Sequence, residues 1–282
     1  MRGTEKILII IPAKNEEENI QYSALSVIHS VVKANLESIV KLVIVDDGST
    51  DDTYKKALTV SKPFNFTKVI RNPVRNPYDS SFGLARAIKL AISFAENKLH
   101  WPWTFLLQVD ADTIIEEKYI TKIMKAAKKH HDIGIFGGIT VNEKASELHI
   151  RNTGWMLRRE VWETCNKYSI LPSPDTMIQL CAIANGWKIG IIKNAKMYLT
   201  RKTVHNPGKI GFTDGLTGVP LNHSIIRLAN QLLHRKGLST IPQYYLNYLR
   251  GRLYNIDIKK ELSRQRRVLL QYRYKEVISK AL

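Results

Sequence analysis

The chain has 282 residues, a formal net charge of +18, and 44% hydrophobic and 9% aromatic residues. These values are typical of a soluble globular protein with one large domain, or one domain with an appendage. No run approaches the roughly 20 apolar residues that cross a bilayer, which argues against a membrane-spanning segment.

Residues 1–131 alternate short apolar runs with helical patterns. The runs that we interpret as buried strands lie at 6–11, 41–49, 68–72 and 104–110. Apolar residues with the spacing of a helix face predict helices at 17–36, 51–62, 83–97 and 116–131. Asp51 or Asp52 can cap the second of these helices. Strands that alternate with helices indicate a doubly wound, largely parallel sheet.

Polar and acidic residues follow three of the predicted strands. They are the pairs Asn15 and Glu16, Asp46 and Asp47, and Asp110 and Asp112. Ligands of open parallel sheets bind beyond the carboxyl ends of the strands. We therefore expect these three loops to converge on one crevice.

After about residue 135 the pattern becomes mixed. The predicted elements are strands and a short helix within 133–141 and 149–162, a helix at 172–186, and late strands at 187–194 and 196–200. Asp175 lies in the first turn of the helix at 172–186. This half therefore predicts a less regular sheet than the first half.

From about residue 222 the chain becomes basic and helical. Residues 223–282 hold 13 Lys and Arg against three Asp and Glu. The apolar residues that share predicted helix faces are Ile225, Leu228, Leu232 and Leu233, followed by Tyr245, Leu249 and Leu253. This asymmetry argues for a polyanionic partner, either a membrane surface or nucleic acid. We predict one domain over 1–221 and a basic amphipathic helical extension over 222–282.

The two cysteines and the start of the chain bear on the compartment. Cys165 and Cys181 are too few for a disulfide framework or a zinc site, and their apolar neighbours predict buried thiols. Residues 1–19 have a short apolar core followed by acidic residues, which we interpret as a first strand and not as a signal peptide. Together these features predict an intracellular protein.

The acidic pair after the strand at 104–110 suits a metal ion. Asp110 and Asp112 are two positions apart, so a strand places both on one side. Two carboxylates without a nearby lysine suit Mg²⁺ or Mn²⁺, which bind a few carboxylates and leave positions for phosphate oxygens. The first strand ends in IPAKNEEEN, with neither a P-loop nor a G-x-G-x-x-G pattern. Phosphate must then be held by a metal and by Arg or Lys.

Four blocks, IPAKNEEENI, VIVDDGSTDDT, GLARAIKLAI and LLQVDADT, resemble in order and spacing the signature of the family-2 glycosyltransferases. The resemblance covers residues 6–115 and continues more loosely to about residue 205. It implies the GT-A fold, a Rossmann-like α/β architecture whose mostly parallel sheet is flanked by helices, here with a basic helical C-terminal extension. It also implies a nucleotide-diphosphate sugar donor and a divalent cofactor, Mg²⁺ or Mn²⁺.

The resemblance also implies which residues hold the donor. The residues that would bind the nucleotide base and ribose are Pro12, Ala13, Glu16, Asp46 and Asp47. The residues alone favour the alternative that the two aspartates are turn residues before a helix cap.

The next two blocks would hold the diphosphate and the metal. Gly83 and Arg86 match a glycine-rich G-x-G-x-A-R pattern, with Arg86 near the diphosphate, although Ser81 replaces the earlier glycine. The alternative is that Arg86 is a solvated helix arginine. Asp112 would coordinate the metal, and Asp110 would lie near sugar or ribose hydroxyls and is a second candidate ligand.

Two later residues complete the implied site. Asp175, in SPDTM, matches the aspartate of the family's E-D motif, its general base, with Pro174 in place of the glutamate. The alternative is a helix-capping aspartate. His205 is a candidate third metal ligand or diphosphate contact, and a loop histidine without a function is the alternative.

The predicted function is a metal-dependent, inverting transfer of a sugar from a nucleotide-diphosphate donor to a hydroxyl or a lipid phosphate. A nucleotidyltransferase would be expected to carry a glycine-rich, basic first loop, and a nucleic-acid-binding protein leaves the acidic residues unexplained. A processive synthase would need membrane spans and a Q-x-x-R-W motif, of which QLLHR at 231–235 is only a partial match.

The expected location is the cytoplasmic face of the inner membrane, as a peripheral protein with a lipid-linked or glycan acceptor. The basic extension would contact anionic lipid, with tyrosines 244, 245, 248 and 254 in the headgroup zone. The alternative is that the apolar stripe packs on the rest of the chain or on a second subunit. No specific nucleic acid is expected, and a homodimer is an open alternative.

Overall fold

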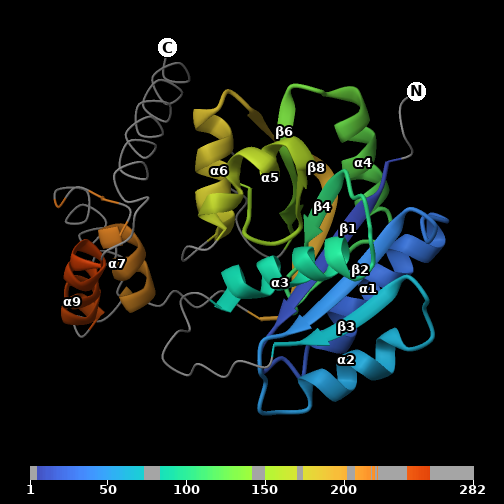
Figure 1. Cartoon of the computed structure of the whole chain (residues 1–282), viewed down its shortest axis with the longest axis horizontal. Coiled ribbons are helices and arrows are strands. Elements are labelled where there is room, and N and C mark those ends of the chain that lie inside the picture. The colour runs from blue at the N-terminus through green and yellow to red at the C-terminus, as the bar shows by residue number, and fades with distance from the viewer. Residues whose placement is uncertain are drawn as a thin grey trace. The chain divides into compact units, whose positions relative to one another are not determined.

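The computed structural model describes residues 5–72, 83–141, 150–169, 174–201, 207–216, 218–219, 221 and 240–254. The chain divides into two compact units, Met1–Lys202 and Thr203–Leu282. Figure 1 shows the elements of both in chain order. The boundary that composition suggests, at residues 221 and 222, stays a prediction.

The first unit is built on one eight-stranded sheet with the strand order β3-β2-β1-β4-β7-β6-β8-β5. The strands are β1 (Ile7–Ala13), β2 (Val40–Asp46), β3 (Thr67–Arg71), β4 (Phe105–Gln108), β5 (Thr113–Ile115), β6 (Ile133–Thr140), β7 (Trp155–Arg158) and β8 (Lys188–Leu199). Strands β3, β2, β1 and β4 are parallel neighbours, as predicted for the first half. β7 is antiparallel to β4 and to β6, so the second half is mixed.

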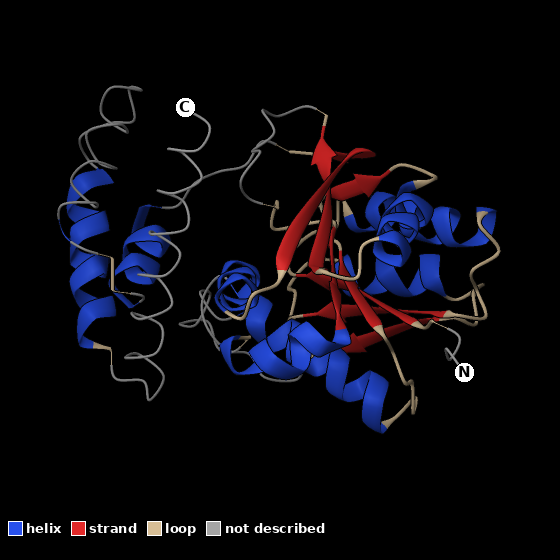
Figure 2. Ribbon diagram, turned by 90° about the horizontal axis from the view of Figure 1, so that it is seen from above, coloured by secondary structure: helices blue, strands red, loops and turns tan. Residues whose placement is uncertain are grey.

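Helices cover both faces of this sheet, as Figure 2 shows. The helices of the first unit are α1 (Ile20–Lys33), α2 (Thr53–Ser61), α3 (Gly83–Asn97), α4 (Tyr119–Lys129), α5 (Arg159–Cys165) and α6 (Pro174–Ala184), with a 3₁₀ turn, η1 (Asn166–Tyr168). Apolar residues of α1, α2 and α4 pack into a single cluster with one face of β1, β2 and β4. α3, α5 and α6 contribute no residue to that cluster, although each contacts strands of the sheet.

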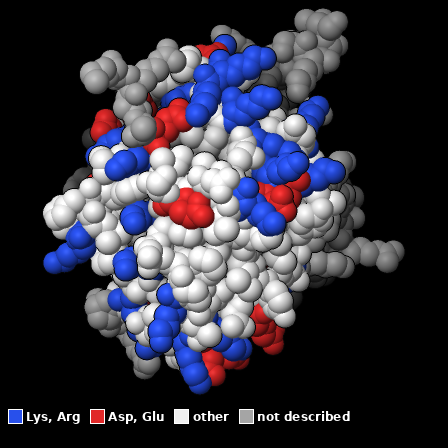
Figure 3. Space-filling view, turned by 90° about the vertical axis from the view of Figure 1, so that its right-hand side faces the viewer, with Lys and Arg blue, Asp and Glu red and all other residues white. Residues whose placement is uncertain are grey.

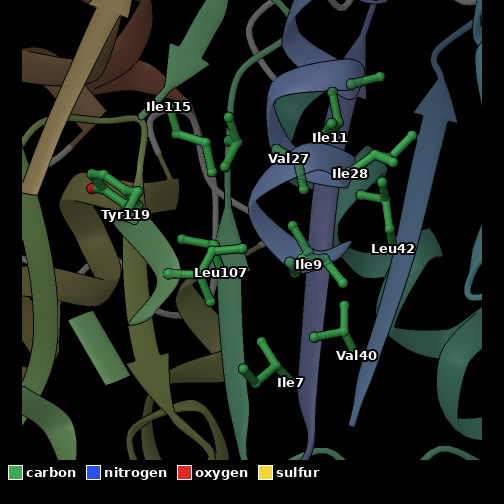
Figure 4. Close-up of a cluster of buried hydrophobic side chains, with 14 of the residues drawn as sticks. Ile7, Ile9, Ile11, Val27, Ile28, Val40, Leu42, Leu107, Ile115 and Tyr119 are labelled. Carbon is green, nitrogen blue, oxygen red and sulfur yellow. The ribbon is translucent and has the colours of Figure 1, made fainter. Parts of the chain in front are cut away.

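The central strand shows why the sheet needs helices on both faces. All five residues of the run Ile7–Ile11 are fully buried. Such a run has no polar face to offer to water, which is the pattern of a strand covered on both sides. Figure 4 shows Ile7, Ile9 and Ile11 on the side of Val27 and Ile28 of α1.

The predicted elements of this unit exist, with two differences. The strand predicted at 104–110 ends at Gln108, because Val109–Asp112 turn into the short strand β5. The predicted strands 187–194 and 196–200 are one strand, β8. The pairing of β8 with β6 shifts register between Gly137 and Ile139. Such an irregularity interrupts the regular alternation of side chains, which is why the sequence pattern predicted two strands where there is one.

The interpretation of the two cysteines as buried thiols is wrong in one respect. Cys165 and Cys181 are buried, but they form a disulfide that joins α5 to α6. The apolar neighbours of each cysteine in the sequence predict burial, but they do not predict whether the two cysteines lie next to each other in the fold. A disulfide needs a short distance between the two Cα atoms, which is 5.8 Å here.

The second unit contains the helices α7 (Pro207–Leu216) and α9 (Thr240–Leu253). They pack closely because α7 presents Gly211 and Gly215, where an added Cβ would lie about 2 Å from the carbonyl oxygens of Tyr244 and Tyr248 (2.1 and 2.0 Å). The two tyrosine hydroxyls are satisfied inside the unit, by Asp214 (2.8 Å) and by the Val219 carbonyl (2.6 Å). Tyr244 and Tyr248 are also buried, which contradicts the prediction that these two side chains lie in a membrane headgroup zone.

The predicted apolar face at Ile225, Leu228, Leu232 and Leu233 lies outside the described residues. In α9, Leu246, Leu249 and Leu253 are exposed. No helix within the described ranges combines the length and the apolar character needed to cross a bilayer.

The surface carries charges of both signs. Figure 3 shows one face of the molecule, on which Lys and Arg side chains lie beside Asp and Glu, with uncharged residues between them. Ion pairs such as Lys128–Glu5 (3.0 Å) and Lys188–Asp132 (2.7 Å) have this character. Exposed pairs of this kind contribute little to stability.

Candidate functional site

The first two loops are bound to each other at the carboxyl ends of β1 and β2. Ala13 pairs with Asp46, and the Asp47 N–H donates to the Ala13 carbonyl (2.8 Å). The Glu16 N–H donates to the hydroxyl of Thr53 at the start of α2 (2.7 Å). These contacts hold Glu16 beside the acidic loop after β2, as the parallel sheet predicted.

Asp46 and Asp47 are buried and each meets a cation. Asp46 is 0% exposed and lies 2.9 Å from the guanidinium Nε of Arg71. Asp47 is 5% exposed and accepts from the side-chain amide of Asn72 (2.7 Å). Its second oxygen lies 3.5 Å from Arg86. Both carboxylates are thus buried with specific partners, but Asp46 also accepts from the Ser49 N–H (3.2 Å), the contact of a turn residue, so the donor-binding role stays a prediction.

Gly83 begins α3 directly against Asp47. A Cβ at this position would lie 2.8 Å from Asp47 Oδ2, closer than such atoms approach. The glycine therefore permits the contact between the start of α3 and the acidic loop. The structure thus brings Gly83 and Arg86 together with Asp47, a contact that we did not predict, and the predicted position of Arg86 near the diphosphate stays a prediction.

A network of buried polar groups positions Asp110. The Gln108 amide donates to Asp110 Oδ1 (2.9 Å), and its oxygen accepts from the Trp155 indole (3.1 Å). The Asp110 N–H donates to Thr153 (2.8 Å). Burial, together with the charge of Asp112, raises the pKa of the Asp110 carboxyl to about 8. Asp110 therefore binds a proton more readily than an ordinary aspartate does.

Asp112 is bound to an arginine that we did not predict. Arg201 follows β8, and its Nε lies 2.8 Å from Asp112 Oδ2. The same guanidinium donates to the carboxylate of Glu16. Burial raises the pKa of Glu16, while the pKa of Arg201 is raised by the two carboxylates despite an opposing effect of burial. The guanidinium thus joins the loop after β1 to the Asp110–Asp112 segment.

Asp175 lies in the first turn of α6 and is 1% exposed. Its Oδ1 has no hydrogen-bond partner among the described residues, and its Oδ2 accepts from Thr176 (3.4 Å). Burial raises the pKa of this carboxyl to about 7. Its charge is also one of the smaller contributions that raise the pKa of Asp110, after burial and the charge of Asp112. A carboxyl with a pKa near neutrality can accept a proton from a substrate hydroxyl.

The donor atoms near Asp112 fit a divalent cation. Within the described ranges, no three His, Cys, Asp or Glu side chains form a metal site by themselves. Mg²⁺ is nonetheless commonly held by one or two carboxylates, with water and substrate phosphates in the other positions. Asp112 already holds a cationic group, the Arg201 guanidinium, so its environment favours positive charge. His205 lies outside the described residues, and its predicted role stays a prediction.

Sequence reasoning missed Arg201 and Gln108. Gln108 has a recognisable signal, because it is a polar residue inside an apolar strand, and here it is 1% exposed. Arg201 follows a late strand whose pairing with β5 the sequence did not predict. Pro12, the remaining residue that was predicted to bind the donor, is the second-last residue of β1 and precedes Ala13.

The chain is similar to several known proteins. The family model described as "Glycosyl transferase family 2" matches residues 8–180. An N-acetylglucosaminyltransferase of Azorhizobium caulinodans is 24% identical in an alignment of 185 residues that covers 63% of this chain and 40% of the relative. The chain therefore spans less than half the length of that curated relative.

Two solved structures share the fold at low sequence identity. S. aureus TarS 1–349 matches with a TM-score of 0.60 and 16% identity, covering 93% of this chain and 87% of that one. Glucosyl-3-phosphoglycerate synthase from Mycobacterium tuberculosis matches with a TM-score of 0.51 and 17% identity, covering 72% and 73%. The family model covers more than half of the chain, and the mixed, helix-flanked sheet agrees with these folds. The chain therefore belongs to glycosyl transferase family 2 and has the GT-A fold.

Proposed function

We propose that this chain is an inverting glycosyltransferase that uses a nucleotide-diphosphate sugar and a divalent cation, Mg²⁺ or Mn²⁺. The observation that carries the proposal is that Glu16 and Asp112 meet around one guanidinium beyond the carboxyl ends of the strands, with Asp110 two residues before Asp112 and with a buried carboxyl, Asp175, as the proposed base. The family match favours this function over the nucleotidyltransferase and nucleic-acid-binding alternatives.

A UDP-sugar is the donor that we propose to test first. TarS has been crystallised with UDP-GlcNAc, and the mycobacterial synthase with Mn²⁺ and UDP. The curated relative is named an N-acetylglucosaminyltransferase. In this chain, Pro12, Ala13 and Glu16 with Asp46 and Asp47 would hold the nucleoside, and Arg86 would lie near the diphosphate.

The proposed reaction is a single displacement at the anomeric carbon. The acceptor oxygen forms a bond to that carbon as the bond to the diphosphate oxygen breaks, which inverts the centre. Asp175 takes the hydroxyl proton, and Asp110 lies near donor hydroxyls. Asp112 would hold the metal, which when bound neutralises the charge that develops on the leaving diphosphate. A lipid phosphate acceptor is already ionised and would need no base.

A thermal-shift panel tests the donor and the metal together. UDP-GlcNAc, UDP-glucose, a GDP-sugar and a dTDP-sugar are each added with Mn²⁺ or with EDTA. We expect a rise in melting temperature for one nucleotide that requires Mn²⁺, since a ligand that binds only the folded state stabilises it. Asp112→Asn is the matched control and should lose the Mn²⁺-dependent rise. No shift with any sugar nucleotide would contradict the proposed donor class.

We also propose that the protein is peripheral and that the C-terminal part of the chain binds the anionic, cytoplasmic face of a membrane. The support is the basic composition of residues 223–282, together with exposed Leu246, Leu249 and Leu253 on α9. Apolar side chains beside Lys and Arg suit the interface of an anionic bilayer.

Liposome flotation tests whether the protein binds an anionic membrane surface. Binding should require anionic lipid, weaken with salt, and fall when Leu249 and Leu253 are both replaced by serine. The control is Leu25→Ser, an exposed leucine of α1. Equal flotation with neutral vesicles would contradict the electrostatic part of the proposal. Disulfides are uncommon in a reducing cytoplasm, so the oxidation state of Cys165 and Cys181 in cells tests the proposed location independently.

A further inference from the structure

Arg201 is held next to Asp112 by the backbone and not by its side chain alone. β5 and β8 are antiparallel, with Thr113 opposite Leu199. One step further, the Thr200 N–H and hydroxyl both donate to the Asp112 carbonyl, at 2.9 and 3.1 Å. The next residue is Arg201, so the fold itself delivers a guanidinium to the carboxylate of Asp112.

The guanidinium occupies the position of a shared cation. It contacts the carboxylates of Glu16 and Asp112, which belong to different loops and would otherwise repel each other. Arg201 is 57% exposed, whereas Glu16 is 10% and Asp112 is 20% exposed at the side chain. The cation is therefore the accessible member of the trio, and it can leave towards solvent while the two carboxylates stay in place.

Two cations that share the carboxylate of Asp112 repel each other. Asp112 Oδ2 accepts from Arg201 Nε at 2.8 Å, a distance that leaves no room for an ion between the two atoms. Direct coordination by that oxygen needs a metal–oxygen distance of about 2.1 Å for Mg²⁺. A dication bound to Asp112 would therefore lie only a few ångströms from the guanidinium, and the repulsion between the two cations favours movement of the guanidinium away from Asp112.

We propose that Arg201 is an exchangeable counter-ion of the donor site, which neutralises Glu16 and Asp112 in the free protein and is displaced from Asp112 when a divalent cation binds. This inference rests on the proposed metal dependence. It assigns Arg201 a positioning role, because the residue holds the two loops together before the donor arrives and lowers the affinity of the empty site for metal.

Mn²⁺ binding without donor measures the exchange directly. The free Mn²⁺ signal in electron paramagnetic resonance is titrated with wild-type protein, Arg201→Gln and Arg201→Lys. An exposed ion pair contributes up to about 1 kcal/mol, so removal of the competing charge should tighten Mn²⁺ binding about fivefold. Lysine keeps the positive charge but cannot contact Glu16 and Asp112 at the same time as the guanidinium does. The Mn²⁺ affinity of Arg201→Lys should therefore lie between those of the wild type and Arg201→Gln.

A matched control separates local competition from total charge. Arg159→Gln also removes one positive charge from two ion pairs, with Glu96 and Glu163, and it lies on α5. Its Mn²⁺ affinity should equal that of the wild type. As a second measurement, Mn²⁺ should raise the melting temperature of Arg201→Gln more than that of the wild type, because the variant leaves Glu16 and Asp112 without their guanidinium.

Unchanged or weaker Mn²⁺ binding by Arg201→Gln would overturn the inference, and so would equal tightening by Arg159→Gln. A wild-type protein and variant that both fail to bind Mn²⁺ would overturn it as well. The proposed function is tested separately by donor binding in EDTA. A UDP-sugar that binds and is transferred without metal would leave the glycosyltransferase proposal intact while the exchange fails.

Discussion

The buried carboxyl of Asp175 should make the stability of the protein depend on pH. Its pKa is raised by burial from 3.8 to about 7. A raised carboxyl pKa contributes stability that is present below the unfolded value near 3.8 and is lost as the pH rises through about 7. A difference of about three pKa units corresponds to a loss on the order of 4 kcal/mol. Asp175→Asn cannot ionise, so it should not lose this contribution.

Urea unfolding at pH 4.5 and pH 8, in EDTA and without donor, measures the effect. The free energy of unfolding of Asp175→Asn, relative to the wild type, should rise by a few kcal/mol between these pH values. Asp132→Asn is the control, because a hydrogen bond from Lys188 lowers the pKa of this exposed carboxyl. A relative stability of Asp175→Asn that is the same at both pH values would refute the reasoning.

The same carboxyl predicts the pH dependence of the reaction. A general base must be ionised, so turnover on a hydroxyl acceptor should rise with pH through about 7. Asp175→Asn should lower kcat by about 10²-fold or more, with donor affinity little changed. Full activity of this variant on a phosphate acceptor would reassign Asp175 without contradicting the family.

Three further changes should have measurable effects. Asp112→Asn should abolish transfer and Mn²⁺-dependent donor binding while the circular dichroism spectrum stays unchanged, and full wild-type activity in excess EDTA would count against a metal at this residue. Gly83→Ala should raise the donor KM about tenfold, because its Cβ would approach Asp47 Oδ2 to 2.8 Å; an unaltered KM would show that the loop adjusts. Reduction of the disulfide between Cys165 and Cys181, which closes a 16-residue separation, should lower the free energy of unfolding by about 3 kcal/mol, as measured by urea titration with and without a phosphine reductant. Equal free energies of unfolding for the oxidised and the reduced protein would show that the disulfide does not stabilise the fold by restricting the unfolded chain.

The sequence predicted the first half of the fold well because its signals are local. The run Ile7–Ile11 and the acidic residues after β2 and β4 are features of neighbouring residues, and parallel strands bring such ends together by topology alone.

The features that the sequence did not reveal depend on distant pairings. Arg201 meets Asp112 only because β8 pairs with the three-residue strand β5, which is too short to be recognised by its pattern. Cys165 and Cys181 pair because α5 and α6 lie side by side. The burial of Tyr244 and Tyr248 depends on two glycines of α7, about thirty residues away in the chain.

The hydrogen-bonded series from Trp155 through Gln108 to Asp110 gives the protein an internal optical reporter. The indole is 1% exposed, so water cannot reach it, and its N–H senses Asp110 through a single amide. Ionisation of Asp110, or the approach of a charged ligand, alters the electric field along the indole. The chain contains five tryptophans, so the difference in emission between the wild type and Trp155→Phe isolates this reporter. Ligand binding beside Asp110 could thereby be followed by tryptophan fluorescence without an attached dye.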